Sequence, residues 1–281
     1  MRRILVISIF FIPFALFSQS DMSSCFRLKT INEQIGINLV TLTDPYLSPL
    51  KYSGSGLTYS YSGRRFLLKD NTFLSSEERF SLLAGMLLNP QNTSEMEIAQ
   101  GTYSWGVHRH FPINDMFQIL AGGNASGLLG VKYLARNVNN PANVDFAVNI
   151  NLSVLLRYKF AFGNFKYNLQ LRLESPVLGC MFAPPLGASY YEMFYLGNLS
   201  NAFHFSSLHN RLGLEYGCTV SFPLRIATIF LDINSNFLTY KANNMLYKFN
   251  NSAISIGWKY DLYIFSGTKN SAPSNFLKTD F

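Results

Sequence analysis

The chain has 281 residues, of which 48% are hydrophobic and only 14% are charged, whereas an average soluble domain carries roughly 25% charged residues. Its formal net charge is +7, but after the N-terminal Arg2 and Arg3 the basic residues form no run beyond the pair Arg64-Arg65, which argues against nucleic-acid binding. The three cysteines, Cys25, Cys180 and Cys218, do not have the even number or the spacing of a disulfide framework. No Cys/His spacing predicts a metal site either. We therefore expect no cofactor, no metal and no nucleic-acid partner.

The N-terminal stretch MRRILVISIFFIPFALFSQS predicts a secretory signal peptide over residues 1–18. Arg2 and Arg3 supply the positive start, an apolar core follows, and Ser18 is a small residue at which cleavage could occur. A transmembrane anchor is the first alternative, but the apolar core is short of the roughly 20 residues that a spanning helix needs. A lipid anchor is the second, but it requires a cysteine directly after the cleavage site, and Cys25 comes too late.

After this segment, apolar and polar residues alternate with period two, which is typical of β-strands that have one apolar face. In residues 143–160, NVDFAVNINLSVLLRYKF, every second residue from Val144 to Phe160 is apolar, and the other row is mostly polar. In chain order, strands are expected at about 29–41, 56–68, 77–89, 98–110, 115–136, 143–160, 164–177, 203–222, 225–237 and 252–264. The count is ten, or twelve if 115–136 divides at GGNASG and 244–265 divides at Asn250-Asn251.

The length of these strands decides between a soluble β-sandwich and a membrane barrel. Eighteen residues at about 3.3 Å each extend roughly 60 Å, which is unusual for a sandwich but crosses a bilayer even when the strand is tilted by about 40°. We therefore expect an all-β, transmembrane antiparallel up-and-down β-barrel, whose apolar rows face lipid and whose closure pairs every backbone polar group. The expected organisation is signal peptide 1–18, barrel 19–265 and polar periplasmic tail 266–281.

The connections are expected to alternate between short and long, as tight periplasmic turns and longer outer loops do. Short ones lie near 110–115, 160–164 and 222–225, and the link after residue 68 is an imperfect short one. Long ones are expected at 42–55, 89–97, 137–142, 178–202 and 239–249. With the N-terminus in the periplasm, 178–202 lies outside the cell.

The polar rows predict which side chains line the lumen. They are Arg157, Lys159, Lys166, Arg172, Glu174, His209, Arg211, Glu215, Asp232, Lys259 and Asp261. One interpretation is that these charges pair across the interior and keep a small barrel closed and rigid, since about eight strands are filled by their own side chains. The other is that they line a narrow channel for small polar solutes. We favour the first.

Loop 178–202 is the segment least explained by a barrel. It is rich in aromatic residues, and a long loop with its own apolar residues is often functional. It could pack into the barrel mouth, act as a lid or contact another envelope protein. The residues expected to do so are Phe182, Tyr190, Tyr191, Phe194 and Tyr195.

No residue is predicted to be catalytic. The candidates for a rim enzyme acting on lipid or peptide are Ser206, Ser207, His209 and Asn210, but positions i and i+2 lie about 6–7 Å apart along a regular strand, beyond hydrogen-bond reach. His108 and His110 could form half of a metal site, but the sequence places no third ligand beside them. We therefore predict that they are ordinary histidines of the lumen or of the membrane interface.

The ending LFSQ of the signal and the segment SPVLGCMFAPPLGASYYEMFYLGN (175–198) resemble a family of small outer-membrane barrels of the Bacteroidetes type with no assigned function. The resemblance implies a Gram-negative outer membrane and membrane lipid as a partner. It offers no catalytic residues. The expected role is therefore structural or interaction, or a narrow channel, with a rim enzyme as the alternative.

Overall fold

The computed structural model describes residues 26–68, 72–163, 165–223, 228–262, 276–277 and 279. Ten long strands form its body: β2 (Lys29–Asp44), β3 (Ser48–Phe66), β4 (Leu74–Leu88), β5 (Glu95–Pro112), β6 (Phe117–Tyr133), β7 (Ala142–Phe162), β8 (Phe165–Phe182), β10 (Arg211–Pro223), β11 (Thr228–Ala242) and β12 (Met245–Leu262). Shorter elements are β1 (Phe26–Arg27), β9 (Phe203–Ser207), β13 (Phe276–Leu277) and the π-helical turn η1 (Tyr191–Tyr195).

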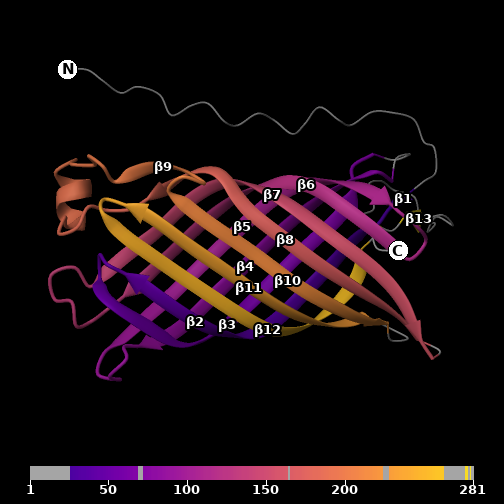
Figure 1. Cartoon of the computed structure of the whole chain (residues 1–281), viewed down its shortest axis with the longest axis horizontal. Coiled ribbons are helices and arrows are strands. Elements are labelled where there is room, and N and C mark those ends of the chain that lie inside the picture. Colours follow the sequence, from indigo (N-terminus) through magenta and orange to yellow (C-terminus); the bar gives the residue numbers. More distant parts are fainter. Residues whose placement is uncertain are drawn as a thin grey trace, which may run out of the picture.

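The ten long strands form a closed antiparallel barrel (Figure 1). Each pairs with its neighbour in the chain, β12 pairs with β2, and β10 pairs with β8 from Ser221↔Asn168 to Glu215↔Glu174. Beyond that point β9 takes over the edge of β8, from Leu178↔Ser207 to Phe182↔Phe203. The expected ten-stranded barrel is confirmed. The twelve-stranded alternative is wrong, because β6 and β12 run unbroken through the proposed division points.

Two of the expected long loops are wrong. Residues 42–55 contain only the turn 45–47 between β2 and β3, and residues 239–249 contain only Asn243-Asn244 between β11 and β12. Both asparagines have positive φ, 49° and 61°, as a two-residue hairpin turn requires, and asparagine tolerates that region better than most residues. The long loop between β8 and β9 is present but begins after Phe182.

The two ends of the barrel differ. At the loop end lie the turns 45–47, 89–94, 134–141, 183–202 and 243–244. At the terminus end, β2 begins and β12 ends. The expected signal peptide lies outside the described residues, as does most of the expected tail, of which 276–277 and 279 are described.

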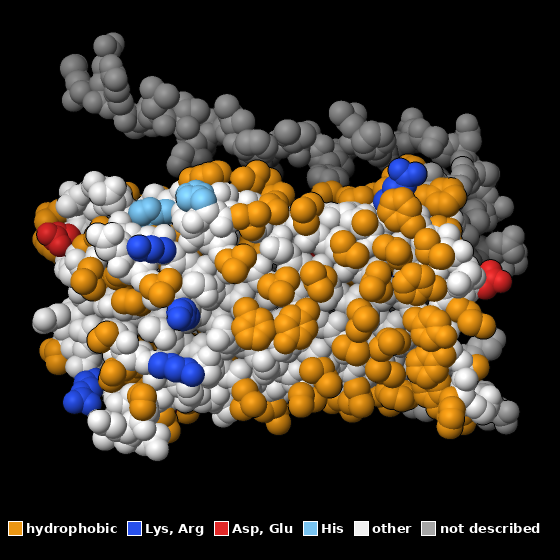
Figure 2. Space-filling view, viewed as in Figure 1, with side chains coloured by type: hydrophobic (Ala, Val, Ile, Leu, Met, Phe, Trp, Pro, Cys, Tyr) orange, Lys and Arg blue, Asp and Glu red, His pale blue; other side chains and the backbone are white. Residues whose placement is uncertain are grey.

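The outward face of the barrel is apolar. On β7, Ile150 and Leu152 are more than half exposed, whereas Asn149 and Asn151, which alternate with them, are buried inside. Figure 2 shows apolar side chains gathered over the middle and the terminus end, and most of the visible Lys and Arg side chains toward the loop end. Among the described residues, no helix is long and apolar enough to cross a membrane.

The inward face changes character along the axis. On β2 the inward row is polar from Thr30 to Asn38, apolar at Val40 and Leu42, and acidic at Asp44. Similar apolar residues from other strands meet there in one buried cluster, the apolar layer. It consists of Val40, Leu42, Tyr46, Leu47, Tyr52, Leu83, Leu87, Met96, Ile98, Leu134, Tyr247 and Phe249. This layer explains why the two loops were predicted wrongly, because near it the apolar residues lie mainly on the inward row and the outward row is mainly polar, so the alternation changes phase relative to the rest of the strand.

Candidate functional site

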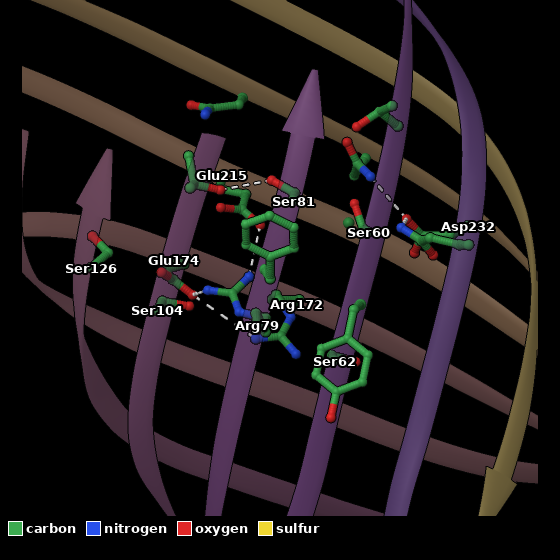
Figure 3. Close-up of a pocket in the computed structure, with 18 of the residues that line it drawn as sticks. Ser60, Ser62, Arg79, Ser81, Ser104, Ser126, Arg172, Glu174, Glu215 and Asp232 are labelled. Carbon is green, nitrogen blue, oxygen red and sulfur yellow. Dashed lines mark hydrogen bonds and ion pairs between the residues drawn. The ribbon is translucent and has the colours of Figure 1, made fainter. Parts of the chain in front are cut away.

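On the terminus-end side of the apolar layer, the barrel interior contains a cavity of about 290 Å³. It extends from Thr30, near the start of β2, to the apolar layer, whose Leu83 and Phe249 also line it. Most of the lining is amides, hydroxyls and charged groups that the strands direct inward (Figure 3). A cavity of this polarity suits water or a small polar solute.

Glu77 on β4 is the centre of a buried ion network in this cavity. Arg172 on β8 donates two hydrogen bonds to its carboxylate, at 3.1 Å and 2.6 Å. Arg64 on β3 forms an ion pair with it at 2.8 Å. The Glu77 side chain is 5% exposed, so two guanidinium groups compensate one carboxylate that water scarcely reaches.

Arg79 extends this network across the lumen. It pairs with Glu174 on β8 and, at 3.0 Å, with Glu215 on β10 (Figure 3). In the barrel order β10 lies opposite β4, with four strands between them on either side. The ion pairs therefore join opposite walls through the middle of the interior, and three arginines balance three glutamates.

A second crossing lies at the loop end. Lys132 on β6 pairs with Asp44 on β2 and, at 2.8 Å, with Asp145 on β7. Its ammonium also sits 4.4 Å from the centre of the Tyr247 ring. Asn143 donates a 2.8 Å hydrogen bond to Asp44. This crossing lies next to the apolar layer, on its loop-end side.

Part of loop 178–202 closes over this second crossing. The Tyr190 hydroxyl donates to Asn143 at 2.8 Å and accepts from the Val144 amide at 2.6 Å, and the Tyr46 hydroxyl donates to the carbonyl of Ala188 at 2.8 Å. Burial raises the pKa of both Tyr46 and Tyr190 to about 12. These phenols are therefore neutral hydrogen-bonding groups at physiological pH.

The other aromatic residues expected in this loop are partly buried and partly exposed. Phe182 is buried against Tyr190, Phe194 and Phe203. Tyr191 and Tyr195 of η1 stack on each other with ring centres 4.7 Å apart, and Tyr195 is 75% exposed. Of the five expected lid residues, Phe182 and Tyr190 thus pack onto the barrel, while Tyr191, Phe194 and Tyr195 are exposed.

The structure brings most of the expected lumen residues inside. Besides the network above, Arg157 donates to Gln170 and to the carbonyl of Thr279, and Arg211 donates to Asn149 at 2.9 Å. Asp232 accepts from Thr219, Asp261 accepts from Thr30, Lys259 lines the cavity, Lys159 is partly buried, and the side chain of Lys166 lies outside the described residues.

The structure corrects the predicted lumen position of His209. The strand expected at 203–222 is interrupted at 208–210, and His209 lies exposed in that turn instead of lining the lumen. The turn also brings the Ser207 hydroxyl within 2.5 Å of His209 Nδ1, so the expectation that they are out of reach is wrong. Asn210 does not orient the histidine, because its carbonyl accepts from the Ser207 amide and its NH₂ donates to Phe205.

His108 and His110 both lie inside the barrel. His108 Nε2 is 3.1 Å from Ser153, and His110 Nε2 is 2.7 Å from Ser75. No group of three or more His, Cys, Asp or Glu side chains with metal-binding geometry occurs within the part of the chain that the structure describes.

Sequence reasoning missed the partners of the predicted charges. Glu77 pairs with Arg172, and Arg79 pairs with Glu174 and Glu215. It also missed Arg64, which pairs with Glu77, and the separate crossing of Lys132 with Asp44 and Asp145. Glu77 and Arg79 lie in a segment whose alternation is weak, since Glu77-Glu78-Arg79 places charges on both faces. Burial of one of two adjacent glutamates could not be read from the sequence.

The fold is similar to that of solved outer-membrane barrels. The transport unit of the autotransporter AIDA-I from Escherichia coli matches with a TM-score of 0.50 and 10% identity, covering 92% of this chain and 94% of that chain. The outer-membrane protease OmpT from Escherichia coli gives 0.47 and 7%, covering 87% and 99%, and the translocator domain of the autotransporter NalP from Neisseria meningitidis gives 0.42 and 11%, covering 87% and 90%. The likeness to the first of these shows the fold alone.

No curated protein matches the sequence. A family model described as "Protein of unknown function (DUF3316)" matches residues 3–269. The expectation of a barrel family without assigned function is thereby confirmed, while the Bacteroidetes origin stays a prediction.

Proposed function

The chain belongs to the DUF3316 family of proteins of unknown function, and from the geometry of its barrel we propose that it is a sealed, non-conducting protein of the Gram-negative outer membrane. The outward apolar rows support the membrane placement, because an antiparallel barrel with this surface satisfies its backbone without water. The loop end then faces the outside of the cell. The role is structural or interaction, with the loop-end surface as the part offered to partners.

The apolar layer is the observation that supports closure. A channel for ions or sugars needs a continuous polar path, because an ion or polar solute that enters an apolar region loses its hydration. In this barrel the cavity reaches Leu83 and Phe249 of the apolar layer, and the same layer contains the fully buried side chains of Val40, Leu87 and Met96. The Lys132 crossing and Tyr190 lie on the loop-end side of the layer.

Solute flux tests closure. Liposomes that contain the protein are expected not to swell in an isotonic solution of arabinose, in contrast to liposomes that contain a general porin. Swelling at a rate that increases with the amount of incorporated barrel would contradict the proposal and favour the channel interpretation.

The exposed aromatic side chains of loop 178–202 support a contact with another envelope protein. Tyr191, Phe194 and Tyr195 are each at least 60% exposed at the loop end, and an aromatic cluster in water is the kind of surface that marks interaction sites. This contact is part of the proposed role.

A rim enzyme is the second candidate, and the Ser207–His209 hydrogen bond is the observation that favours it. A serine beside a histidine is the minimal arrangement for an activated nucleophile, and the surrounding Phe205, Leu208 and Leu212 are exposed and apolar, as a lipid ester would require. We rank it second, because within the described residues no carboxylate or amide hydrogen-bonds to His209 and orients it.

A fluorophosphonate reagent tests this candidate. If the protein is a rim enzyme, the reagent labels the wild type, labelling is lost in Ser207→Ala and it is strongly reduced in His209→Ala. Ser206 is a buried neighbour, so Ser206→Ala is expected to retain the labelling. If the folded wild-type barrel is not labelled, the candidate is removed.

A further inference from the structure

In the part of the chain that the structure describes, the outward face of β6, β7 and β8 carries no charged side chain. On β7 the outward row is Ala142, Val144, Phe146, Val148, Ile150, Leu152, Val154, Leu156, Tyr158, Phe160 and Phe162. The outward rows of β6 and β8 among the described residues also contain no Lys, Arg, Asp or Glu. This three-stranded surface is called the tall wall below.

The opposite side of the barrel is different. On β12, Lys248, Asn250 and Ser252 face outward at the loop end, and the apolar row begins only at Ile254. The neighbouring strands repeat this pattern. Their outward polar residues at the loop end are Thr41 and Thr43 on β2, Lys51, Ser53 and Ser55 on β3, and Thr239 and Lys241 on β11.

The two sides therefore present apolar bands of different height. From Val144 to Phe162 the β7 row extends roughly 60 Å along the strand, which corresponds to about 45 Å along the axis at a tilt of about 40°. From Ile254 to Leu262 the β12 row corresponds to about 20 Å by the same arithmetic. The apolar band of an outer-membrane barrel is about 25 Å tall, so β12 matches it and the tall wall exceeds it.

Tilting the barrel in the bilayer cannot remove this excess, because it occurs at both ends. At the loop end the tall wall stays apolar up to Phe146 and its neighbour Leu129 on β6, both exposed. At the terminus end, β7 continues to Phe162 although β6 begins opposite Tyr158, and Figure 1 shows the β7–β8 hairpin projecting there. A tilt that immersed one end would lift the other out.

We propose that the tall wall is the contact surface between two copies of this chain. All copies insert in the same direction, so a two-fold axis between two copies runs parallel to the barrel axis. Residues at a given depth on one tall wall then face residues at the same depth on the other. A second copy thus matches the tall wall at both ends, which a lipid bilayer of uniform thickness does not. The proposal rests on the membrane placement proposed above.

Two properties of the wall suit a copy of itself. It carries no charge, so like-charge repulsion does not oppose self-association. In addition, the middle of the outward β6 row consists of small residues, which allow close approach of two membrane proteins. They are Ala121, Gly123, Ala125 and Gly127.

Cysteine cross-linking in lipid vesicles tests the proposal. In a chain whose three cysteines are replaced by serine, we introduce Phe146→Cys, Ile150→Cys or Val154→Cys on the tall wall and Ile254→Cys on β12 as the control. Ile150 and Ile254 are similarly exposed, at 56% and 66%. On oxidation, at least one tall-wall variant is expected to give mostly a product of twice the chain mass, while Ile254→Cys gives only background.

Heat-modifiable migration on gels, measured on the same samples, shows whether each variant is folded and inserted. A failure of membrane placement is therefore distinguishable from a failure of dimerisation. Equal cross-linking of Ile254→Cys, no dimer from any tall-wall variant, or a product with the mass of a different protein would each overturn the proposal.

A charge provides a second readout. Phe146→Lys lies beyond the apolar band, so the barrel still inserts, but a lysine at an apolar interface is expected to raise the apparent dissociation constant of the dimer at least about tenfold. Ser252→Lys, at an outward position on the opposite side, is expected to leave it unchanged. Energy transfer between differently labelled copies measures both, and a dimer insensitive to Phe146→Lys would contradict the assigned surface.

Discussion

Replacing Leu87 by alanine is expected to lower the free energy of unfolding by about 2–5 kcal/mol, as for large-to-small substitutions in a close-packed core. Leu87 points inward from β4 and is fully buried in the apolar layer. The alanine variant leaves a cavity that its rigid strand neighbours cannot fill. If water filled this part of the lumen instead of protein, the same substitution would cost little.

Met86 is the matched control, because it is the preceding residue and points outward, where it is 61% exposed. We expect Met86→Ala to cost less than about 1 kcal/mol, since mobile lipid can occupy the vacated space. Reversible unfolding by guanidinium in lipid vesicles measures both variants. Equal losses, or a larger loss for Met86→Ala, would show that the inward and outward rows of β4 are assigned wrongly.

Replacing Glu77 by glutamine is expected to lower the free energy of unfolding by about 3–5 kcal/mol, the usual cost of breaking a buried ion pair by removing one partner. Arg64 and Arg172 would remain buried and charged without their shared carboxylate. Glutamine has almost the same shape as glutamate, so the loss reports the missing charge and not a change in packing.

Glu215→Gln is the control for this prediction. Among the described residues Glu215 pairs only with Arg79, which keeps Glu174, and its side chain is 38% exposed. We expect a loss below about 1 kcal/mol, typical of partly solvated pairs. If the two variants lost equal stability in the same unfolding measurement, Glu77 would not be the centre of the network.

The sequence predicted the ten-stranded barrel and the residues that face outward, because the alternation in 143–160 and its copies depends only on the local period of a strand. It also predicted half of the central ion network, namely Arg172, Glu174 and Glu215. It could not identify their partners, since Arg79 meets Glu215 across the barrel, and the register around the barrel that brings them together is not encoded in either strand alone.

The loop end was predicted less well for a physical reason. Leu42, Tyr52, Tyr247 and Phe249 point inward into the apolar layer, so in these segments the apolar row is the inward one and the pattern no longer continues the apolar outward row of the same strand. Likewise, the regular alternation of 203–222 hid the interruption at 208–210, which removes His209 from the lumen row. Both errors arise where tertiary packing overrides the local pattern.

Ion conductance in planar bilayers tests the central claim, that the interior is closed, most directly. With the wild-type protein inserted, as verified by its heat-modifiable migration from the same preparation, we predict no steady current above that of the bare bilayer at any moderate voltage. A steady ohmic current that increases in equal steps with each inserted barrel would contradict closure and show that the polar cavity continues through the apolar layer.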